Sequence, residues 1–577
     1  MSFARTMAGL INTAGDVKAS AVGDVGLTVY STLDSLPTSS LTAGDQAYVS
    51  SNRRFYISNG SGWYNVALAN ASPSLTVSNG TVTLATDGVT PTVITLTATD
   101  SDNPLAAITY TVESDGNFVG LATLSQDSSV FTITPLSEGS ATTTSSTLTF
   151  KASDGISFGT GTTVLSLSFG VDWTTATETV IGNSWGSSGN GDYLGMYQMS
   201  ISGNGQWLAI PSYRIQRNGQ YTGGCHIFER VGNSWTYRTV LTANEFSSAT
   251  ESLFAAYADL NYDGSILTLS GTAKGVNEGD LWIFTRTGSS WAEYSSSARD
   301  LAAWTAISNE YLGQNSRISG DGSTIVMGQR GWASGIGAVR CLRKTGSTWA
   351  FANTTPLSVS GTGGNTNFGF SVDIDSDAST IVAGWTNVQS SYVAAVYSNK
   401  YNGTEDAFLT DNDYKAGYTS TVCISGDGTQ IAVAQQNWDN GGTETNKGKV
   451  TMYYGSGSSW TKGQTLTGSL SAANGFFGSS LTMDRNGLTL LVGAYSETVN
   501  VGGIDYAQGR MYAFTRDSAN ATTWNENATF TSSLTAKGSD RFGWTNTITS
   551  DGTVALVNAA FADSDFTNSG AVFEYRL

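Results

Sequence analysis

Apolar and polar residues alternate in short runs along most of this chain, and tight-turn sequences separate the runs. In the stretch 318–349, apolar runs at residues 324–327 and 337–342 follow one another with turns between them. Short runs of this kind, bounded by turn residues, predict β-strands. The stretch therefore predicts four antiparallel strands, which is the size of one blade of a β-propeller.

The hairpin turn of this unit recurs at a nearly fixed spacing of about 58 residues. Its copies are Gly203-Asn204-Gly205, Tyr262-Asp263-Gly264, Gly320-Asp321-Gly322, Ser376-Asp377-Ala378, Gly426-Asp427-Gly428, Arg485-Asn486-Gly487 and Ser550-Asp551-Gly552. Asp-Gly and Asn-Gly favour two-residue hairpin turns of the primed types, which require positive φ. A long fixed period indicates an array of repeats, and seven copies predict a seven-bladed β-propeller over residues 171–577.

The seventh copy is incomplete at its C-terminal end. Its third strand, at residues 570–575, is followed almost directly by Leu577, so a fourth strand is missing there. A segment with a suitable pattern, residues 172–180, stands just before the first copy. We expect this segment to complete the last blade, because that pairing removes two open sheet edges.

The chain before the array divides into three parts. Residues 1–27 predict an anchor or a flexible segment, residues 28–70 a small β-meander, and residues 74–170 an immunoglobulin-like β-sandwich of about seven strands. The meander buries little apolar surface, which predicts that it needs a neighbour or an oligomer, such as a trimer. The fold class predicted for the whole chain is all-β.

The net charge and composition exclude some classes of binding partner. The chain has 46 Asp and Glu against 28 Lys and Arg, a net charge of −18, which repels phosphate backbones and anionic membrane surfaces. We therefore expect no nucleic-acid partner. No apolar run approaches the roughly 20 residues of a membrane span, so no membrane insertion is expected. Cys225, Cys341 and Cys423 fall in different repeats and are predicted to be free and buried, and His226 is predicted to be a strand residue.

Little in the sequence favours catalysis. With one histidine, no Gly-x-Ser-x-Gly motif and no metal-ligand cluster, only a pair of carboxylates of the glycosidase type could serve a reaction. The expectation is that the protein is not an enzyme, and a polysaccharide depolymerase is the alternative.

Recognition is expected on one end of the predicted ring. The hairpin connections are short and uniform, whereas the loops between second and third strands vary and carry aromatic residues beside Asn, Asp and Gln. Variable loops on a rigid scaffold are where binding usually lies, although aromatic loops that fold back on the ring are an equal alternative. The candidate binding residues are Tyr213, Trp332, Trp385, Trp438, Tyr495, Tyr506 and Phe561.

Residues 74–170 resemble cadherin-like domains. The resemblance is carried by Ala98-Thr99-Asp100-Ser101-Asp102, by Ile108-Thr109-Tyr110 and by Ala152-Ser153-Asp154-Gly155. In that family the matching acidic positions bind Ca²⁺, so the resemblance implies a calcium site at Asp100, Asp102 and Asp154. The acidic linker motif that ends such domains is absent, and aspartates that cap turns are the alternative. No other cofactor is expected.

The chain as a whole resembles tail-fibre or appendage proteins of tailed, in particular marine, bacteriophages. The resemblance is carried by Gly44-Asp45-Gln46-Ala47-Tyr48-Val49 and Gly62-Trp63-Tyr64, followed by an immunoglobulin-like module and a distal β domain. It implies a virion protein that binds other virion proteins through its N-terminal region and recognises a carbohydrate of the host surface. A virion decoration protein without receptor activity and a bacterial surface adhesin are the alternatives. Residues 1–11 are too short an apolar stretch for an export signal, which favours the virion.

Overall fold

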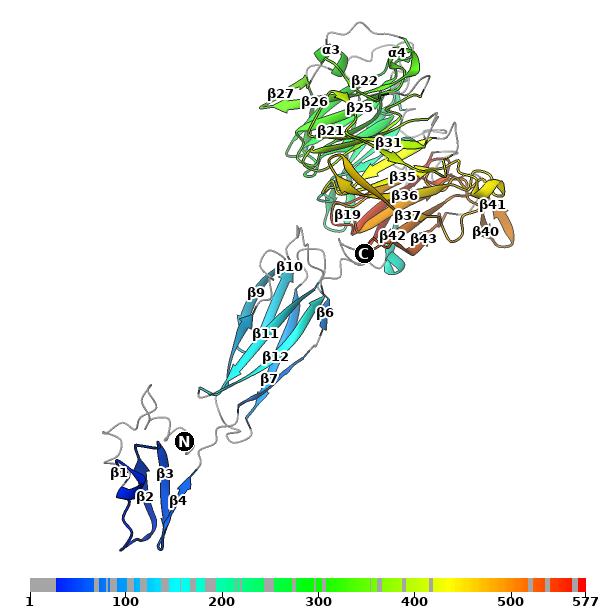
Figure 1. Ribbon diagram of the computed structural model, residues 1–577. Coiled ribbons are helices and arrows are strands. Elements are labelled where there is room, and N and C mark those ends of the chain that lie inside the picture. The colour runs from blue at the N-terminus through cyan, green and yellow to red at the C-terminus, as the bar shows by residue number, and fades with distance from the viewer. Residues whose placement is uncertain are drawn as a thin grey trace. The chain divides into compact units, whose positions relative to one another are not determined.

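Strands make up nearly all of the regular structure, as the alternating pattern predicted. The described chain separates into two compact units, the first containing β1–β12 and the second β13–β46 (Figure 1). This computed structural model describes residues 27–66, 72–78, 81–83, 91–100, 108–114, 122–135, 145–155, 157–166, 173–181, 193–212, 215–217, 220–242, 254–271, 277–294, 297–302, 308–352, 354–360, 366–386, 391–414, 419–516, 522–534, 540–562 and 569–577. The predicted anchor segment, residues 1–27, lies outside them except for Leu27.

The first unit begins with a small four-stranded sheet in the order β1-β2-β3-β4. Its elements are β1 (Thr28–Tyr30), η1 (Leu33–Ser35), β2 (Ala43–Val49), β3 (Arg54–Asn59) and β4 (Trp63–Val66). The last three strands form an antiparallel meander within residues 28–70, where the sequence predicted one, and β1 adds a parallel partner to β2. Four residues, Leu36, Ala47, Val49 and Tyr56, form its core, which is as small as expected.

Two further four-stranded sheets pack face to face in the first unit, in the orders β5-β7-β10-β9 and β6-β12-β11-β8. Alternation places Ile94 and Leu96 of β7 inside, and the rings of Phe131 and Phe150 meet between the sheets at 4.9 Å. The strands are β5 (Ser74–Val77), β6 (Thr81–Thr83), β7 (Thr92–Thr99), β8 (Thr109–Ser114), β9 (Ala122–Asp127), β10 (Val130–Pro135), β11 (Ser145–Ser153) and β12 (Phe158–Ser166).

The second unit is a ring of seven antiparallel sheets, the architecture of a β-propeller. Sheet 1 contains β14 (Ser200–Ile201), β15 (Trp207–Ser212), β18 (Gly224–Val231) and β19 (Ser234–Leu241). Sheet 2 contains β20 (Tyr257–Leu260), β21 (Ile266–Gly271), β22 (Asp280–Thr287) and β23 (Ser290–Glu293). Sheet 3 contains β24 (Leu312–Ile318), β25 (Thr324–Gln329), β26 (Ala338–Thr345) and β27 (Thr348–Phe351), extended by β28 (Leu357–Ser358) and β32 (Gly403–Thr404).

The remaining sheets repeat this plan. Sheet 4 contains β29 (Ser371–Ile374), β30 (Thr380–Gly384), β31 (Tyr392–Ser398) and β33 (Ala407–Thr410). Sheet 5 contains β34 (Ser420–Ile424), β35 (Gln430–Gln435), β36 (Lys449–Ser456) and β37 (Ser459–Leu466). Sheet 6 contains β38 (Ser480–Met483), β39 (Thr489–Ala494), β42 (Arg510–Thr515) and β43 (Asn525–Phe530). Sheet 7 contains β44 (Phe542–Ile548), β45 (Val554–Ala559), β46 (Ala571–Arg576) and β13 (Thr177–Ile181).

Short elements lie between these strands. They are η2 (Trp173–Thr175), the hairpin β16 (Gln216–Arg217) and β17 (Gln220–Tyr221), α3 (Ala298–Ala302), α4 (Trp332–Gly335), η3 (Asn440–Gly442), and the hairpin β40 (Val499–Val501) and β41 (Ile504–Tyr506). Among the described residues, no helix is both long and apolar enough to cross a membrane.

The predicted closure by the segment before the first repeat is confirmed. Strand β13 pairs antiparallel with β46, from Thr177 opposite Arg576 to Ile181 opposite Val572. Just before β13, the side chain of Trp173 is fully buried and meets the ring of Phe530 edge-on at 6.3 Å. The last sheet is therefore built from both ends of the second unit.

A belt of backbone hydrogen bonds joins the seven hairpin turns. Each turn donates an N–H to a carbonyl of the next turn in the ring, and the last bond, from Ser550 to Gly203, closes the circle at 2.9 Å. The other six bonds run from Asn204 to Tyr262, Tyr262 to Gly320, Asp321 to Ser376, Ser376 to Gly426, Asp427 to Arg485 and Arg485 to Ser550, at 2.9–3.2 Å. We call this end of the ring the turn face.

The prediction of two-residue primed turns is wrong. In the turn of sheet 3, the N–H of Ser319 donates to the carbonyl of Thr324, so four residues form the loop, and Gly322 has positive φ while Asp321 does not. Asp321 instead accepts the N–H of Ser323 on its carboxylate at 2.8 Å and gives its own N–H to the belt. A longer loop leaves this N–H free to bond outside its own hairpin.

The opposite end of the ring carries the loops between second and third strands together with the crossings between sheets. Parallel bridges there join the end of one such loop to the start of the next sheet, as between Gly279 and Leu312 or between Gly509 and Phe542. We call this end the loop face. The loops between second and third strands, where the sequence analysis expected binding, therefore share one face of the ring.

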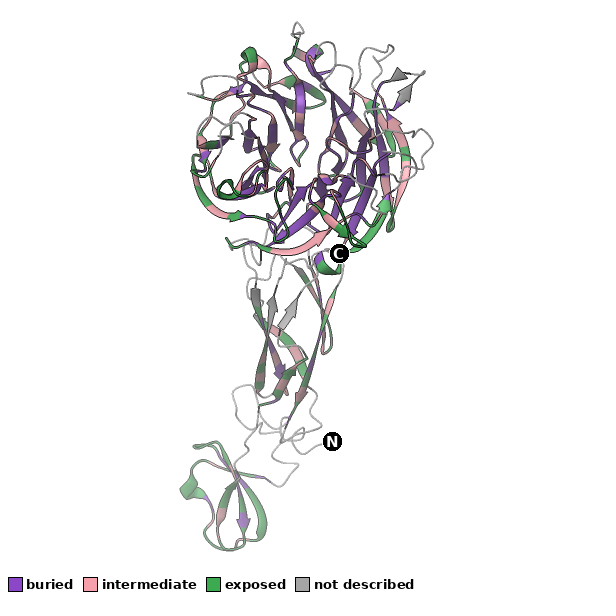
Figure 2. Cartoon of the chain, turned by 90° about the vertical axis from the view of Figure 1, so that its right-hand side faces the viewer, coloured by how far each residue is buried: buried purple, intermediate pink, exposed green. Residues whose placement is uncertain are grey.

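Apolar side chains fill the space between neighbouring sheets. Every residue of the second strands β15, β21, β25, β39 and β45 is buried (Figure 2). Cys225, Cys341 and Cys423 are free and buried, as predicted. His226 lies buried in β18, and burial lowers its pKa to about 4, so it is neutral at pH 7.

Candidate functional site

A row of five aromatic rings lies on the loop face where sheets 6, 7 and 1 meet. The ring of Phe476 stacks on Tyr495 at 5.2 Å, Tyr495 meets Trp544 at 4.4 Å, Trp544 meets Phe561 at 6.4 Å, and Phe561 meets Tyr193 at 5.0 Å. All five side chains are only partly buried. We call this row, with Arg541, the aromatic cluster.

Arg541 lies against the middle of the cluster. Its guanidinium carbon is 4.7 Å from the ring centres of both Trp544 and Phe561 and 5.4 Å from that of Tyr495. Cation–π attraction therefore fixes the side chain, and within the described residues it has no carboxylate partner. Burial raises the pKa of the Tyr495 hydroxyl, which stays protonated and able to donate a hydrogen bond.

The repeat explains how these side chains come together. Tyr193, Phe476 and Arg541 each stand directly before a Leu-Gly or Phe-Gly pair at the start of a first strand, and each has a positive φ, between 51° and 58°. Tyr495 and Phe561 each follow the end of a second strand. Two positions of the repeat thus supply most of the cluster: the residue before the Leu-Gly or Phe-Gly pair and a residue just after the second strand. At the first position, the positive φ turns the side chain away from the strand ladder.

Two predicted binding residues, Tyr495 and Phe561, belong to the cluster. Four cluster residues, Tyr193, Phe476, Arg541 and Trp544, were not predicted, because they stand beside the Leu-Gly and Phe-Gly pairs that precede the first strands and not in the variable loops. Aligning the seven repeats on those pairs would have shown that large side chains precede or follow them at these positions.

The other predicted residues are scattered. Trp332 begins α4 and is partly buried, with Arg340 at 6.0 Å from its ring. Trp438 donates its indole N–H to Asp413 at 2.9 Å and lies 5.1 Å from Lys449. Tyr506 pairs with Val499 in the hairpin β40–β41. Tyr213 falls outside the described residues.

Trp385 does not fit a binding role. Its side chain is 3% exposed and packs between Phe368 and Phe408 in the core of sheets 3 and 4. The residue follows β30 directly, and its side chain points into the core as those of the strand do. An aromatic residue beside a strand end can complete the core as readily as a loop, which the sequence pattern does not distinguish.

Apart from the aromatic cluster, the loop face has a hollow beside Trp332 with a volume of about 640 Å³. Arg330 stacks over Tyr311 at 4.0 Å in its wall, and Ala333 and Ser334 both have positive φ. The lining is Ser308, Asn309, Glu310, Tyr311, Arg330, Gly331, Ala333, Ser334, Gly335 and Asn367. This polar hollow offers donors and acceptors but few exposed rings.

One buried carboxyl group close in sequence to the cluster, that of Glu497, is closed to ligands. Burial raises the pKa of Glu497 to about 7, but both its oxygens accept from the hydroxyl of Tyr512, at 2.7 and 2.8 Å, and Arg510 lies 3.2 Å away. Its side chain is 1% exposed. This carboxyl therefore ties the loop after β39 to β42 and is not placed to donate a proton to a bound sugar.

The residues implied for calcium lie in the first unit. Asp154 accepts the N–H of Ser157 at 2.8 Å, which caps the turn between β11 and β12, and Asp100 is buried at the end of β7. Asp102 lies outside the described residues, so the site itself stays a prediction. Within the described residues, no group of three or more His, Cys, Asp or Glu side chains could hold a metal.

Comparison with known proteins gives distant likenesses. No protein-family model matches the chain, and no curated protein matches it. Among solved structures, a Quinonprotein alcohol dehydrogenase-like protein from Bacteroides thetaiotaomicron matches with a TM-score of 0.32 and 9% identity, over 78% of this chain and 93% of that one.

Two further matches are of the same kind. The β-propeller domain of the Trilobed protease from Pyrococcus furiosus has a TM-score of 0.33 and 8% identity, over 62% of this chain and 89% of that one. Prolyl oligopeptidase B from Galerina marginata has a TM-score of 0.34 and 10% identity, over 71% of this chain and 53% of that one. Function therefore has to be argued from the chain's own side chains.

Proposed function

We propose that the second unit recognises a carbohydrate through the aromatic cluster, and that the chain is an adhesive protein rather than an enzyme. The observation that carries the proposal is the row of five partly exposed rings, from Phe476 to Tyr193, on one face of a rigid ring of sheets. Contiguous aromatic side chains outside the core usually mark a binding surface.

Sugar chemistry suits this surface. The faces of pyranose rings present C–H groups, which pack against the electron-rich faces of Tyr and Trp rings. The hydroxyl groups at the sugar's edge need donors and acceptors, and the guanidinium of Arg541 and the hydroxyl of Tyr495 stand beside the rings. A few polar groups among apolar ones are what orient a ligand.

We also infer that the seven sheets are the blades of a seven-bladed β-propeller, and that residues 74–170 form an immunoglobulin- or cadherin-like module. The closed belt of seven turn-to-turn hydrogen bonds supports the first inference, and the two face-to-face sheets support the second.

The setting that we propose is a virion, with the chain as a tail fibre or appendage that binds a host-surface glycan. The resemblance of residues 44–64 to such proteins supports it. The proposal requires the chain to be found by mass spectrometry in purified phage particles. Its absence from particles, with presence on a bacterial surface, would favour an adhesin instead.

The binding proposal is tested by screening the full chain on an array of bacterial surface polysaccharides. We expect the double variant Tyr495→Ala and Trp544→Ala to bind the recognised glycan at least tenfold more weakly, because each lost aromatic contact is worth about 1–2 kcal/mol. The matched control replaces one Tyr and one Trp of outer strands, Tyr237→Ala and Trp460→Ala, which are also partly buried.

The control variant should bind as the unchanged chain does. Equal binding by the cluster variant and the unchanged chain, or equal loss in both double variants, would remove the aromatic cluster as the recognition surface.

A further inference from the structure

The central channel of the ring opens at the turn face, where it forms a hollow of about 150 Å³. One turn residue from each of the seven sheets frames this opening: Gly203, Tyr262, Gly320, Ser376, Gly426, Arg485 and Ser550. The glycines are needed, because a Cβ at position 203 would collide with Ser550 and Tyr262, and one at position 426 with Arg485 and Ser376. Of these seven turn positions, only four carry a side chain, and they belong to sheets 2, 4, 6 and 7: Tyr262, Ser376, Arg485 and Ser550.

One layer deeper, three charged residues stand at the same register on the neighbouring strands β20, β24 and β29. Arg317 lies between Asp259 and Asp373, at 3.7 and 3.5 Å from their carboxylate oxygens. Each carboxylate also accepts a backbone N–H of the next strand, from Ile318 at 2.8 Å and from Ile424 at 2.9 Å. The two aspartates thus hold adjacent strands together, and they balance the charge of Arg317.

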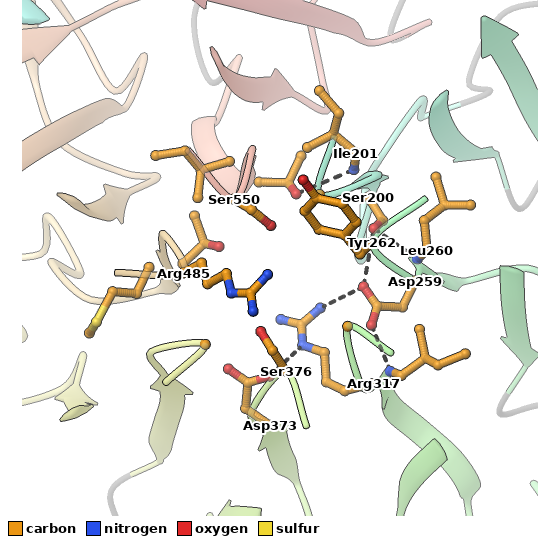
Figure 3. A pocket seen from close by; sticks show the side chains of 18 of the residues that line it. Ser200, Ile201, Asp259, Leu260, Tyr262, Arg317, Asp373, Ser376, Arg485 and Ser550 are labelled. Atoms are coloured by element: carbon orange, nitrogen blue, oxygen red, sulfur yellow. Dashed lines mark hydrogen bonds and ion pairs between the residues drawn. The ribbon is translucent and has the colours of Figure 1, made fainter. Parts of the chain in front are cut away.

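Arg485 has no such balance. Its side chain is exposed, its guanidinium carbon is 5.9 Å from the ring of Tyr262, and no carboxylate of the described residues lies within ion-pair distance. In Figure 3 the guanidinium groups of Arg485 and Arg317 both point toward the middle of the channel, with the side chains of Ser376 and Ser550 beside them. Because the two aspartates already offset Arg317, Arg485 is the guanidinium at this opening that has no anionic partner among the described residues.

We propose that the channel mouth binds a small oxyanion, a carboxylate, sulfate or phosphate group, through the guanidinium of Arg485 and the hydroxyl groups of Ser376 and Ser550. The planar fork of a guanidinium matches two oxygens of such a group, and hydroxyls supply further donors. The chain's charge of −18 disfavours anions at long range, but salt screens that repulsion beyond about 8–10 Å, so contacts inside the hollow decide. The site lies on the face opposite to the aromatic cluster and does not depend on it.

The test is isothermal titration calorimetry on the full chain with sodium sulfate, sodium phosphate and sodium glucuronate, at constant ionic strength set with chloride. Glucose serves as the neutral counterpart of glucuronate. We expect at least one of the three anions to bind, and Arg485→Gln to weaken that binding at least tenfold. The matched control is Arg343→Gln, because Arg343 is also exposed and stacked on a tyrosine, Tyr401, at 4.7 Å, but lies on β26 away from the channel.

The three anions show which chemical group the site recognises. Similar binding of all three identifies a general oxyanion site, binding of glucuronate alone identifies an acidic sugar, and binding of sulfate or phosphate alone identifies a tetrahedral group. The double variant Ser376→Ala and Ser550→Ala keeps the arginine and should weaken the same binding about threefold or more. Absence of binding by all three anions, or unchanged binding by Arg485→Gln, would overturn the proposal.

Discussion

The two faces of the ring differ in how their side chains are used. At the turn face, backbone groups bond from one sheet to the next, and carboxylates such as Asp321 cap their own turns. At the loop face, parallel bridges and backbone hydrogen bonds, such as that from Phe542 to Gln508, also join neighbouring sheets, but large side chains such as Trp544 are left partly exposed. The faces thus differ less in their backbone bonding than in their side chains: the turn face presents small turn residues, whereas the loop face presents a row of exposed rings that is free to bind.

The comparison is tested most strongly by opening the ring. A chain that begins at residue 182 lacks β13 and the buried Trp173, whereas one that begins at residue 168 keeps both. We expect the shorter chain to melt at least about 5 °C lower, because loss of a buried Trp alone costs about 3–5 kcal/mol. Calorimetry measures the difference, and equal melting temperatures would show that β13 does not hold the ring closed.

A smaller effect is expected from a single turn. Asp427 accepts hydrogen bonds from Ser425, from the N–H of Thr429 and from its hydroxyl, so Asp427→Ala should cost about 1–2 kcal/mol of stability. Glycan binding should not change, because the turn lies on the opposite face from the aromatic cluster. A loss of glycan binding at unchanged stability would reverse the roles of the two faces.

The smallest expected effect is the pH dependence of stability that comes from one turn, that of sheet 6. Burial raises the pKa of Asp484 to about 7 from an ordinary value of 3.8. Between these values the folded chain holds more protons than the unfolded chain, so the stability that this group contributes is complete below pH 4 and is lost as the pH rises through 7. Glu497, with a pKa of about 7, and Asp259, with one of about 6, act in the same direction.

The variant Asp484→Ser isolates the contribution of that turn. Ser425 occupies the same turn position in sheet 5, and its hydroxyl accepts the N–H of Gln430 as Asp484 accepts that of Thr489. We expect the melting temperature of the unchanged chain to fall between pH 5 and pH 8, and the fall to be about 1–2 °C smaller in the variant. Identical pH profiles would assign the dependence to other groups.

Much of the fold could be predicted from local pattern. Alternation and turn residues are short-range signals, so the repeating four-stranded unit, the small β-meander and the closing strand β13 were predicted near their observed places. The geometry of the turns was not, because the N–H of Asp321 bonds to Ser376 of another repeat, and a hairpin motif read by itself does not show that partner.

The candidate site was predicted only in part, for a related reason. Tyr495 and Phe561 stand in variable loops and were found. Tyr193 and Arg541 are about 350 residues apart in sequence, and both contact Phe561 only because the ring closes. Trp385 was misplaced because a ring next to a strand end packs inward as readily as outward. Whether a side chain at a strand end points into the core or out of it depends on the strand's register within the ring, which the local sequence does not show.

The most direct test of the central claim is hydroxyl-radical footprinting of the full chain with and without the glycan that the array identifies. Oxidation of Tyr495, Trp544 and Phe561 on the loop face should fall when the glycan is bound, while oxidation of Tyr262 on the turn face should stay the same. Protection of Tyr262 with no change at Trp544 would contradict the account and place recognition at the channel mouth.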